Sequence, residues 1–459
     1  MALGKRKTEE QGAWLTSGEL PKSPGHPFYD QLNRLLAQAG FDPLVETLCA
    51  PYYSEVMGAP SIPPGMYFRM LFVGYLEGID SQRGIAWRCV DSLSLRSFLG
   101  LGPTEPSPDH SSLTRIRRRL PQEVFDAVFQ KVLGMIHERG LLKGQTVAVD
   151  ATLVEANAAL KAIVRKDTGE NYQEFLERLA KEAGIEDPTP RDLQRMDKTR
   201  KGKKMSNQDW ESSTDPDSRI MKMKDGRTLL SYKVEHVMDI ETDVVLSAKV
   251  FPGDVGDGDS MMDSLGAASD NLAEVEEGLE ITTAVADNGY HSVAKLVECE
   301  ERGIRTYIPE AREAYRRVWT DKPEGWKEAF HGNRRRCRGK RNKGLQRLRR
   351  ERMERSFAHT CETGRARRSW LRGVREVAKR YLMQVTARNL GFLMRALFGI
   401  GTPRTLQGEA GFVFSLAVRV HGAFSGLFRR LRLVTRLRST PRDFSLSRSC
   451  SETGYASAA

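Results

Sequence analysis

The chain has 459 residues, of which 39% are hydrophobic and 29% are charged, so we expect two or three folding units with real cores. It has no apolar run long enough for a membrane span, and its basic first residues are not followed by the apolar stretch of a signal peptide. Its six cysteines are scattered and form no Cys-x-x-Cys pair, which argues against a disulfide framework and a structural zinc site. We therefore expect a cytoplasmic protein that does not bind membranes.

The charge is positive and uneven. The formal net charge is +12, with an isoelectric point near 9.4. Residues 311–380 hold 24 Lys and Arg against 8 Asp and Glu, a local excess of 16. A polyanion such as DNA is the usual partner of a surface of this kind. The alternative is a solvated or disordered basic segment.

The region from residue 26 to about residue 140 has a helical pattern. Apolar residues recur at intervals of three and four over residues 28–36. Two prolines at 63 and 64 suit the first turn of a second helix, which we expect to reach Leu76. Further helices are expected at Gln82–Asp91 and around Leu95–Leu99.

A basic helix follows over Leu113–Leu120, and Ser111 or Ser112 could cap its first turn. Short helices that end in a capped, arginine-rich one are typical of a helix-turn-helix that enters the major groove. We therefore interpret residues 26–140 as a DNA-binding domain. An ordinary helical domain with a basic surface helix is the alternative. The candidate DNA contacts are Arg115, Arg117, Arg118 and Arg119.

After residue 140 the pattern changes to short strands. Thr146–Asp150 and Thr282–Asp287 are apolar, β-branched runs that each end in an acid. Between them lie two longer strand candidates joined by a turn, and then a helix. The expected elements after Asp150 are strands at Thr228–Asp239 and Val244–Phe251, a helix from Met261, the strand Thr282–Asp287, a helix at Val293–Arg302 and a strand at 305–309. This is the order of an α/β RNase H-like fold, although other α/β domains share it.

Two segments interrupt the expected catalytic domain at residues 141–400. A charged insert over 156–226 contains one expected helix at 172–183 and is otherwise loop-like. Residues 321–350 are basic and loop-like, and end in a helix that we expect from about Gly344 to His359. We expect a disordered leader at 1–25 and a basic tail at 401–459, with an amphipathic stretch at 416–437.

Asp150 and Asp287 are candidate metal ligands. Acids at the ends of neighbouring strands can share divalent metal ions, and Mg²⁺ prefers carboxylate oxygens. Two such ions can activate an attacking oxygen and stabilise the leaving one. Each acid also has an ordinary explanation, because Asp287-Asn288-Gly289 is a common turn sequence and Asp150 could cap a turn.

A third acid is expected on the later basic helix. Helical spacing places Arg347, Arg350 and Glu354 along one face, on the side where Phe357 would turn inward. This geometry favours Glu354, although a single glutamate on a helix is usually only solvated. The acids available are Glu351, Glu354, Glu362 and Glu376.

Five segments resemble a known family in the expected order. The last of the five looks like that family's closing helix. The segments are 61–70 with 108–113, Val149-Asp150-Ala151-Thr152, Ala286-Asp287-Asn288-Gly289-Tyr290, Glu354-Arg355-Ser356-Phe357-Ala358-His359, and Asn389-Leu390-Gly391-Phe392-Leu393-Met394-Arg395. Together they are similar to the DDE transposases of bacterial insertion sequences, and the match spans roughly residues 26–403.

This resemblance implies an RNase H-like core in which Asp150, Asp287 and Glu354 hold two Mg²⁺ ions, with Mn²⁺ as a substitute. It implies double-stranded DNA as the partner, namely the element's terminal inverted repeats and a target, and a homo-oligomer that pairs two ends. The chain differs from the family's extended signature at two positions, since Arg347 stands for Tyr and Cys361 for Lys. Arg350 is the expected phosphate contact.

Other readings remain beside this one. Arg347 and Arg355 are further candidate DNA contacts on the same helix. Trp210 and Trp319 could stack on an extruded base, although a half-buried core position is more usual for tryptophan. The alternatives for function are an inactive or repurposed transposase that only binds DNA, and a metal-dependent DNA nuclease.

Overall fold

The computed structural model describes residues 25–54, 56–58, 60–102, 105–200, 206–223, 225–311 and 318–407. The expected leader falls outside these ranges except for its last residue. The expected tail falls outside them beyond residue 407, and this includes the amphipathic stretch 416–437.

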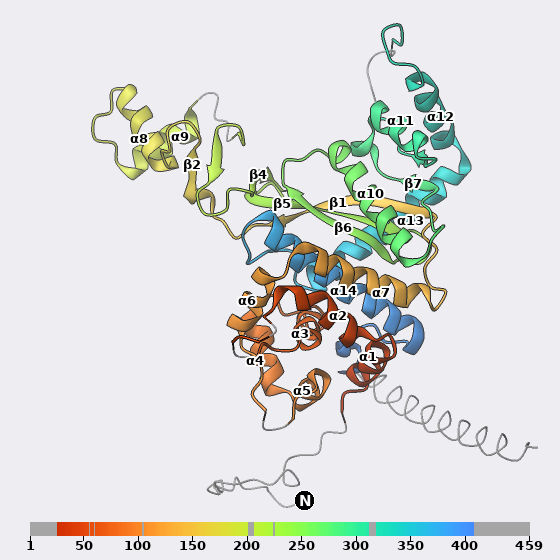
Figure 1. Ribbon diagram of the computed structural model, residues 1–459. Helices are drawn as coiled ribbons and strands as arrows, with labels where there is room; N and C mark the ends of the chain where they lie inside the picture. The colour runs from red at the N-terminus through yellow and green to blue at the C-terminus, as the bar shows by residue number, and fades with distance from the viewer. Residues whose placement is uncertain are drawn as a thin grey trace, which may run out of the picture. The chain divides into compact units, whose positions relative to one another are not determined.

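The N-terminal part is helical, as predicted (Figure 1). Its helices are α1 (Pro27–Gln38), α2 (Phe41–Cys49), α3 (Pro64–Glu77), α4 (Gln82–Asp91), α5 (Leu93–Leu99), α6 (His110–Arg119) and α7 (Gln122–His137), with a short turn η1 (Ala50–Tyr52). The cap of α6 differs from the expectation. Asp109 has extended backbone and accepts the Ser112 amide at 2.7 Å, because Ser111 and Ser112 already lie in the first helical turn.

A buried arginine holds the first helices together. The Arg69 guanidinium donates to both carboxylate oxygens of Asp42, at 2.5 and 2.9 Å, and to Asn33 Oδ1 at 2.9 Å. It also lies over the rings of Phe41 and Phe98, at 5.7 and 5.8 Å from their centroids. Because the charge is paired and its donors are used, its burial among α1, α2, α3 and α5 is tolerated.

The second part is built on a mixed sheet. Its strands are β1 (Thr146–Glu155), β4 (Arg219–Lys222), β5 (Thr228–Asp239), β6 (Val245–Pro252), β7 (Thr283–Val285) and β8 (Arg305–Tyr307). The order is β4-β5-β1-β7-β8, with β6 also paired to β5. β1 is antiparallel to β5 and parallel to β7, and β7 is parallel to β8. The elements therefore follow the order that the sequence predicts.

The expected end of the first strand is wrong. β1 pairs with β5 from Val147, opposite Asp239, to Glu155, opposite Ser231. The strand therefore continues five residues past Asp150, which lies within it, because the long β5 supplies hydrogen-bonding partners along its whole length. β7 ends at Val285, so Asp287 follows its strand by two residues.

Helices cover both faces of the sheet (Figure 1). On one face, Glu235 of β5 accepts the Ser260 hydroxyl of α10 at 2.7 Å. The next residue, His236, faces the other way and contacts Ser356 and Tyr381 at 3.1 and 2.9 Å. The helices of this part are α10 (Asp257–Val275), α11 (Val293–Glu301), α12 (Trp326–Arg338), α13 (Lys340–Phe357) and α14 (Val374–Phe398), with the short 3₁₀ helices η3 (Asn288–Tyr290) and η5 (Pro403–Gln407) and the π-helix η4 (Ala358–Thr363).

The charged insert has more structure than its composition predicts. It contains η2 (Leu160–Ala162), β2 (Ile163–Arg165), α8 (Tyr172–Glu182), α9 (Pro190–Thr199) and β3 (Trp210–Ser212). Trp210 is only 3% exposed and packs against the rings of Tyr172 and Phe175. It is therefore the centre of a small local core, and this placement does not favour a role as a base-stacking shelf.

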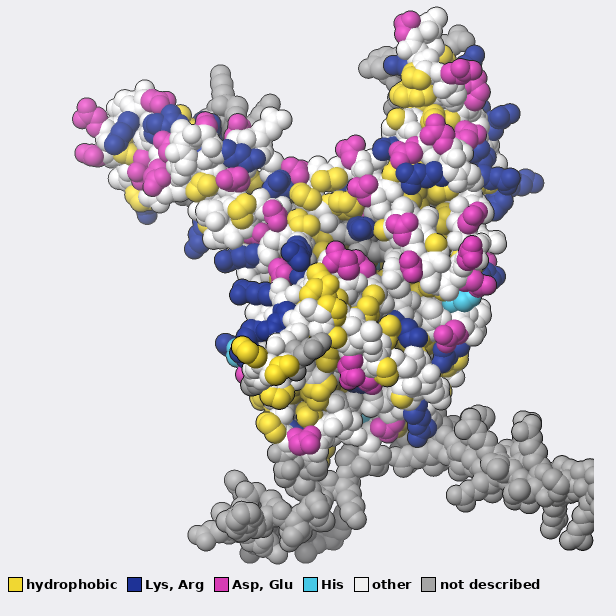
Figure 2. All heavy atoms as spheres, viewed as in Figure 1, with side chains coloured by type: hydrophobic (Ala, Val, Ile, Leu, Met, Phe, Trp, Pro, Cys, Tyr) yellow, Lys and Arg dark blue, Asp and Glu magenta, His cyan; other side chains and the backbone are white. Residues whose placement is uncertain are grey.

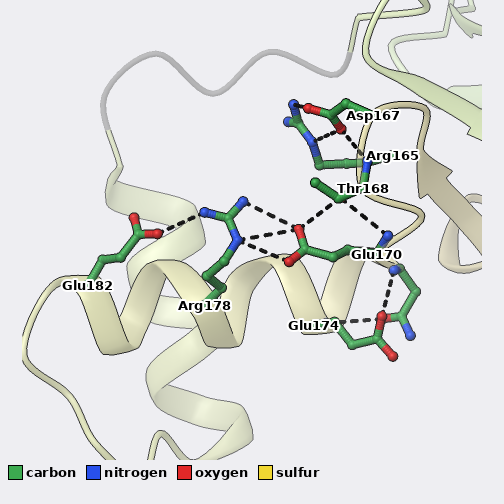
Figure 3. A network of polar contacts seen from close by, with 8 residues as sticks. Arg165, Asp167, Thr168, Glu170, Glu174, Arg178 and Glu182 are labelled. Carbon is green, nitrogen blue, oxygen red and sulfur yellow. Dashed lines mark hydrogen bonds and ion pairs between the residues drawn. The ribbon is translucent and has the colours of Figure 1, made fainter.

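Several charges of the insert pair with one another. Figure 3 shows the Arg178 guanidinium between Glu170, at 3.0 Å, and Glu182, at 2.8 Å. In the same view Arg165 pairs with Asp167 at 2.6 Å. The described basic residues of this network are thus neutralised locally.

The prediction of a loop over 321–350 is also wrong. Residues 326–338 form α12, and α13 begins at Lys340 rather than near Gly344. Asn333 of α12 is buried and exchanges hydrogen bonds with the backbone of Ile308 at 3.2 and 2.8 Å, while Phe330 packs against Trp319. These tertiary contacts stabilise a segment whose arginine-rich composition alone did not indicate a packed helix.

No helix in the described ranges has the length and apolar character that a bilayer crossing requires.

A buried ion cluster joins α6 to α14 and gives a stability prediction. Glu376 accepts from Arg117 at 2.6 Å and from Lys379 at 3.1 Å, and both cations are almost fully buried. Glu376→Gln leaves them without a counter-charge, so we expect a loss of about 3 kcal/mol in the free energy of unfolding. Urea denaturation measures it. Glu182→Gln, which removes an exposed ion pair with Arg178, should cost below about 0.5 kcal/mol. Equal effects of the two changes would contradict the prediction.

Candidate active site

The sheet brings Asp150 and Asp287 to neighbouring positions. β1 and β7 are parallel, and Ala148 is paired with Val285. Asp150 lies two residues after Ala148, and Asp287 lies two residues after Val285. The two aspartates therefore occupy equivalent positions along neighbouring segments. Asp287 also caps the turn η3, because its side chain accepts the Gly289 amide at 2.9 Å. The structure thus joins two acids that lie 137 positions apart in the sequence.

The Asp150 carboxyl is partly buried and has charged neighbours of both signs. Its side chain is 26% exposed, and burial raises the pKa of Asp150 to about 6. The Arg349 guanidinium and the Ala151 amide act against this rise, whereas the negative charges of Asp287 and Asp257 add to it. A divalent cation between these carboxylates would relieve their repulsion. The oxygen donors of Asp150 and Asp287 are also the type that Mg²⁺ prefers.

A third acid, Asp257, lies beside Asp287. It is the first residue of α10 and pairs with the buried Lys233 at 2.7 Å. A Cβ atom added to Gly289 would come within 2.8 Å of Asp257 Oδ2 and 3.1 Å of Asp287 Oδ1. Only glycine therefore fits between the two carboxylates as they stand. The Asp/Gly-rich segment 254–260 signalled an unusual loop, but its several acids gave no way to choose Asp257.

Glu354 lies on α13 but is exposed. Arg352 and Arg355 reach Asp243 at 2.6 and 3.0 Å on one flank of the helix. The helical spacing places Glu354 on the opposite flank, with Arg350 one turn before it. Among the residues that the structure describes, no three His, Cys, Asp or Glu side chains are grouped closely enough to hold a metal ion. Asp150 and Asp287 thus come together without Glu354.

Polar contacts fix α13 across the strand ends. Gln346 donates to the carbonyl oxygens of Ala286 and Tyr307 at 3.0 and 2.9 Å. Arg349 donates to Gln346 Oε1 at 3.1 Å and to Asp150 Oδ2 at 2.8 Å. The sequence analysis did not single out Gln346 or Arg349. A signal was available, since the two are three residues apart and share the inward face with Met353, but arginine on a basic helix usually marks the solvated side.

The α13 candidates for DNA contact differ in their exposure. Arg347 and Arg350 are exposed. Arg355 is partly buried and divided between Asp243, at 3.0 Å, and Glu351, at 2.6 Å. Arg347 and Arg350 are therefore available to a polyanion, while Arg355 first has to leave its acidic partners.

The candidates on α6 separate in a similar way. Arg115, Arg118 and Arg119 are exposed, and Figure 2 shows Lys and Arg side chains gathered on the flank where α6 lies. Arg117 is only 6% exposed and points inward to Glu376. This placement gives Arg117 the task of holding α6 on α14 and does not favour contact with DNA.

An arginine-rich loop that the sequence analysis did not identify lies beside β1. The amide of Glu155 donates to the carbonyl of Arg367 at 3.0 Å, and the Ser369 amide donates to the carbonyl of Glu155 at 2.8 Å. The Arg367 side chain reaches Thr152 Oγ1 at 3.4 Å. Thr152 is two residues past Asp150 and on the same face of the strand, so Arg367 is a basic neighbour of the site.

Comparison with family models gives two matches. The model described as Transposase domain (DUF772) matches residues 19–119, and the model described as Transposase DDE domain matches residues 142–390. The second match covers more than half of the chain and includes Asp150, Asp287 and Glu354. Searches of curated proteins and of solved structures give no match.

The raised pKa of Asp150 predicts that its ionised form lowers the stability of the folded protein. Its pKa is about 6 in the folded protein and about 4 when unfolded, so folding favours the protonated form. The contribution of protonated Asp150 to the free energy of unfolding is therefore fully present below about pH 4 and is lost as the pH rises through 6. In metal-free buffer we expect Asp150→Asn to raise the free energy of unfolding by about 2 kcal/mol at pH 8, with little gain at pH 4.

Urea denaturation at both pH values checks this expectation. Asp263→Asn changes an exposed aspartate of α10 and should stay within about 0.5 kcal/mol of the unmodified protein. An Asp150→Asn variant that is less stable at pH 8 would show that the Arg349 pair outweighs burial.

Proposed function

Because the chain belongs to the Transposase DDE domain family, whose members are metal-dependent enzymes of DNA phosphoryl transfer, we propose that it binds the terminal inverted repeats of its own element, cuts the DNA there and joins the 3′-OH ends to target DNA. The observation that carries this proposal is the adjacency of Asp150 and Asp287 beneath α13, the helix that bears Glu354. The strand order β6-β5-β1-β7-β8, antiparallel and then parallel, supports an RNase H-like core.

Two Mg²⁺ ions are the proposed cofactor, with Mn²⁺ as a substitute. The carboxylate oxygens of Asp150 fit such ions, and Asp287 adds a neighbouring carboxylate whose negative charge acts on Asp150. Glu354 would complete the ligand set from the flank of α13. Bound divalent ions would stabilise negative charge on the attacking and leaving oxygens of the phosphoryl transfer.

The chain's own residues would position the DNA strand. In the cutting step a bond forms between a water oxygen and phosphorus while the bond from phosphorus to the 3′-oxygen breaks, and this oxygen takes a proton to leave a free 3′-OH. In the joining step the oxygen of that 3′-OH bonds to the phosphorus of a target phosphodiester, the bond from this phosphorus to the target's own 3′-oxygen breaks, and the leaving oxygen takes up a proton in place of the one that the attacking hydroxyl loses. Arg350, exposed on α13, would hold a phosphate by two parallel hydrogen bonds.

DNA recognition is proposed for the N-terminal helices. Arg115, Arg118 and Arg119 lie exposed on α6, which Asp109 caps. Contacts from such arginines to phosphates give strongly salt-dependent binding. Pairing of two element ends requires two catalytic domains, so we propose that a homo-oligomer assembles on DNA.

Replacement of Glu354 tests the third ligand. Glu354→Gln keeps size and hydrogen bonding but removes the negative charge, so we expect Mg²⁺-dependent nicking at the repeat boundary to fall at least 100-fold. Repeat binding should stay within twofold. The measurement is cleavage of a labelled duplex with the element's own end, with Mg²⁺ and with EDTA. Glu351→Gln changes an exposed glutamate one turn earlier and should retain activity; the opposite ranking would reassign the ligand.

Gly289 gives a second test. In Gly289→Ala the new methyl group meets the ends of two flexible carboxylate side chains, so stability should change little. The carboxylates of Asp257 and Asp287 have to move apart, and we expect cleavage to fall roughly 10- to 100-fold, since small displacements are costly in phosphoryl transfer. Gly344→Ala, where a Cβ meets no atom within 4 Å, is the control. Unchanged cleavage in Gly289→Ala would remove Asp287 from the proposed site.

One observation favours a second candidate function. Arg347 and the buried Cys361 stand where the family signature has Tyr and Lys, which fits a transposase that now only binds DNA. Specific binding of the repeat without nicking, in the same cleavage experiment, would support that alternative. Nicking without joining to a target duplex would indicate a nuclease.

A further inference from the structure

Arg349 is placed unusually for an arginine of a basic helix. It is only 7% exposed, whereas its neighbour Arg350 is exposed. Its Nη1 atom donates to Asp150 Oδ2 at 2.8 Å, and its Nε atom donates to Gln346 Oε1 at 3.1 Å. The guanidinium is therefore held from one side by a glutamine and from the other by a candidate metal ligand.

Gln346 anchors this arrangement to the sheet. Its amide nitrogen donates to the carbonyl of Ala286, the residue before Asp287, and to the carbonyl of Tyr307 at the end of β8. Its oxygen remains to accept from Arg349. Gln346 thus fixes the Nε side of Arg349 relative to β7 and β8, while the Nη end extends to β1.

The two oxygens of Asp150 have different partners. Oδ1 accepts the amide of the following residue, Ala151, at 2.9 Å, which orients the carboxylate within the strand. Oδ2 is the oxygen that Arg349 contacts. A Mg²⁺ ion binds carboxylate oxygen at about 2.1 Å. An ion on Oδ2 would then lie close to the guanidinium, where like charges repel strongly in a site of low dielectric constant.

We propose that Arg349 is a displaceable counter-ion of the active site: it holds Asp150 Oδ2 until a divalent cation takes that oxygen, and it then turns its free Nη end to a phosphate of the bound DNA. The inference rests on the proposed function for its second half, whereas its first half concerns metal binding alone. Gln346 is the positioning residue, because its bond to Nε keeps the guanidinium at the site during the exchange. Arg349 thus neutralises Asp150 before the metal binds, and a DNA phosphate afterwards.

Competition of this kind gives two effects of opposite sign. In Arg349→Gln the competing charge is gone, so Mn²⁺ alone, measured by isothermal titration calorimetry on the full chain, should bind about tenfold more tightly. Mn²⁺-dependent nicking should fall at least tenfold, because the phosphate contact is lost as well. A purely structural Arg349 would instead weaken metal binding and nicking together, and that result would overturn the proposal.

Two further variants make the test specific. Arg352→Gln removes another arginine of α13, whose partner is Asp243, and its Mn²⁺ affinity should equal that of the unmodified protein. An equal gain in Arg352→Gln would show a general charge effect and reject the proposal. Arg349→Lys keeps a competing cation, so its Mn²⁺ affinity should stay within about twofold of the unmodified protein; a tenfold gain would also reject the proposal. Thermal melting first confirms that each variant is folded. Should Arg349→Gln not fold, Arg349→Met takes its place, because it also lacks the competing charge and should also bind Mn²⁺ about tenfold more tightly.

The outcomes separate this inference from the proposed function. If the unmodified protein binds Mn²⁺ but does not nick its repeat, the proposed function fails, and tighter binding in Arg349→Gln still supports the counter-ion. If the unmodified protein nicks DNA and Arg349→Gln binds Mn²⁺ with unchanged affinity, the counter-ion is rejected and the proposed function stands.

Discussion

The docking of α13 on the sheet is the constraint on which the candidate site depends. Eight of the 18 residues of this helix are Lys or Arg, so the burial of apolar side chains contributes little to its packing on the sheet. Directional polar contacts replace it: Gln346 binds two strand-end carbonyls, Arg349 binds Asp150, and Ser356 binds His236. Such contacts are sensitive to register, because a shift by one residue would turn every one of them away from its partner. They therefore determine where Glu354 lies relative to the sheet.

His236 extends this constraint to the rest of the molecule. Burial, together with the nearby charge of Arg388, lowers the pKa of His236 to about 3, so its ring is neutral at ordinary pH. One ring nitrogen contacts Ser356 of α13 and the other contacts Tyr381 of α14. The same helix α14 holds α6 through Glu376 and its buried cations. The basic helix of the N-terminal part and the strand pair β1–β5 that carries Asp150 are thus connected through buried polar contacts of α14, in addition to the buried apolar side chains of that helix.

The carboxylates of Asp150, Asp257 and Asp287 show a conflict between stability and chemistry. The negative charges of Asp287 and Asp257 act against ionisation of Asp150, and only a glycine at 289 fits between the carboxylates of Asp257 and Asp287 as they stand. Folding therefore brings negative charges together at a cost in the free energy of unfolding. Lys233 and Arg349 offset part of that cost, one on each face of the sheet. Carboxylates placed in this way are suited to bind divalent cations.

The sequence by itself determined the order of elements and the length of β5, because strand periodicity is a local pattern. It predicted Asp150 and Asp287 as candidate metal ligands, because each follows a short apolar run. It also predicted Glu354, chiefly through its resemblance to a family. Only the tertiary structure decided that Asp150 lies within a strand, that residues 326–338 form a helix, and that Arg117 and Arg349 turn inward while Arg350 stays exposed. The physical reason is that the sequence does not show whether an arginine side chain contacts water or a buried carboxylate. Its partner, as with Arg349 and Asp150, can lie 199 residues away, and the chain has to fold before the two meet.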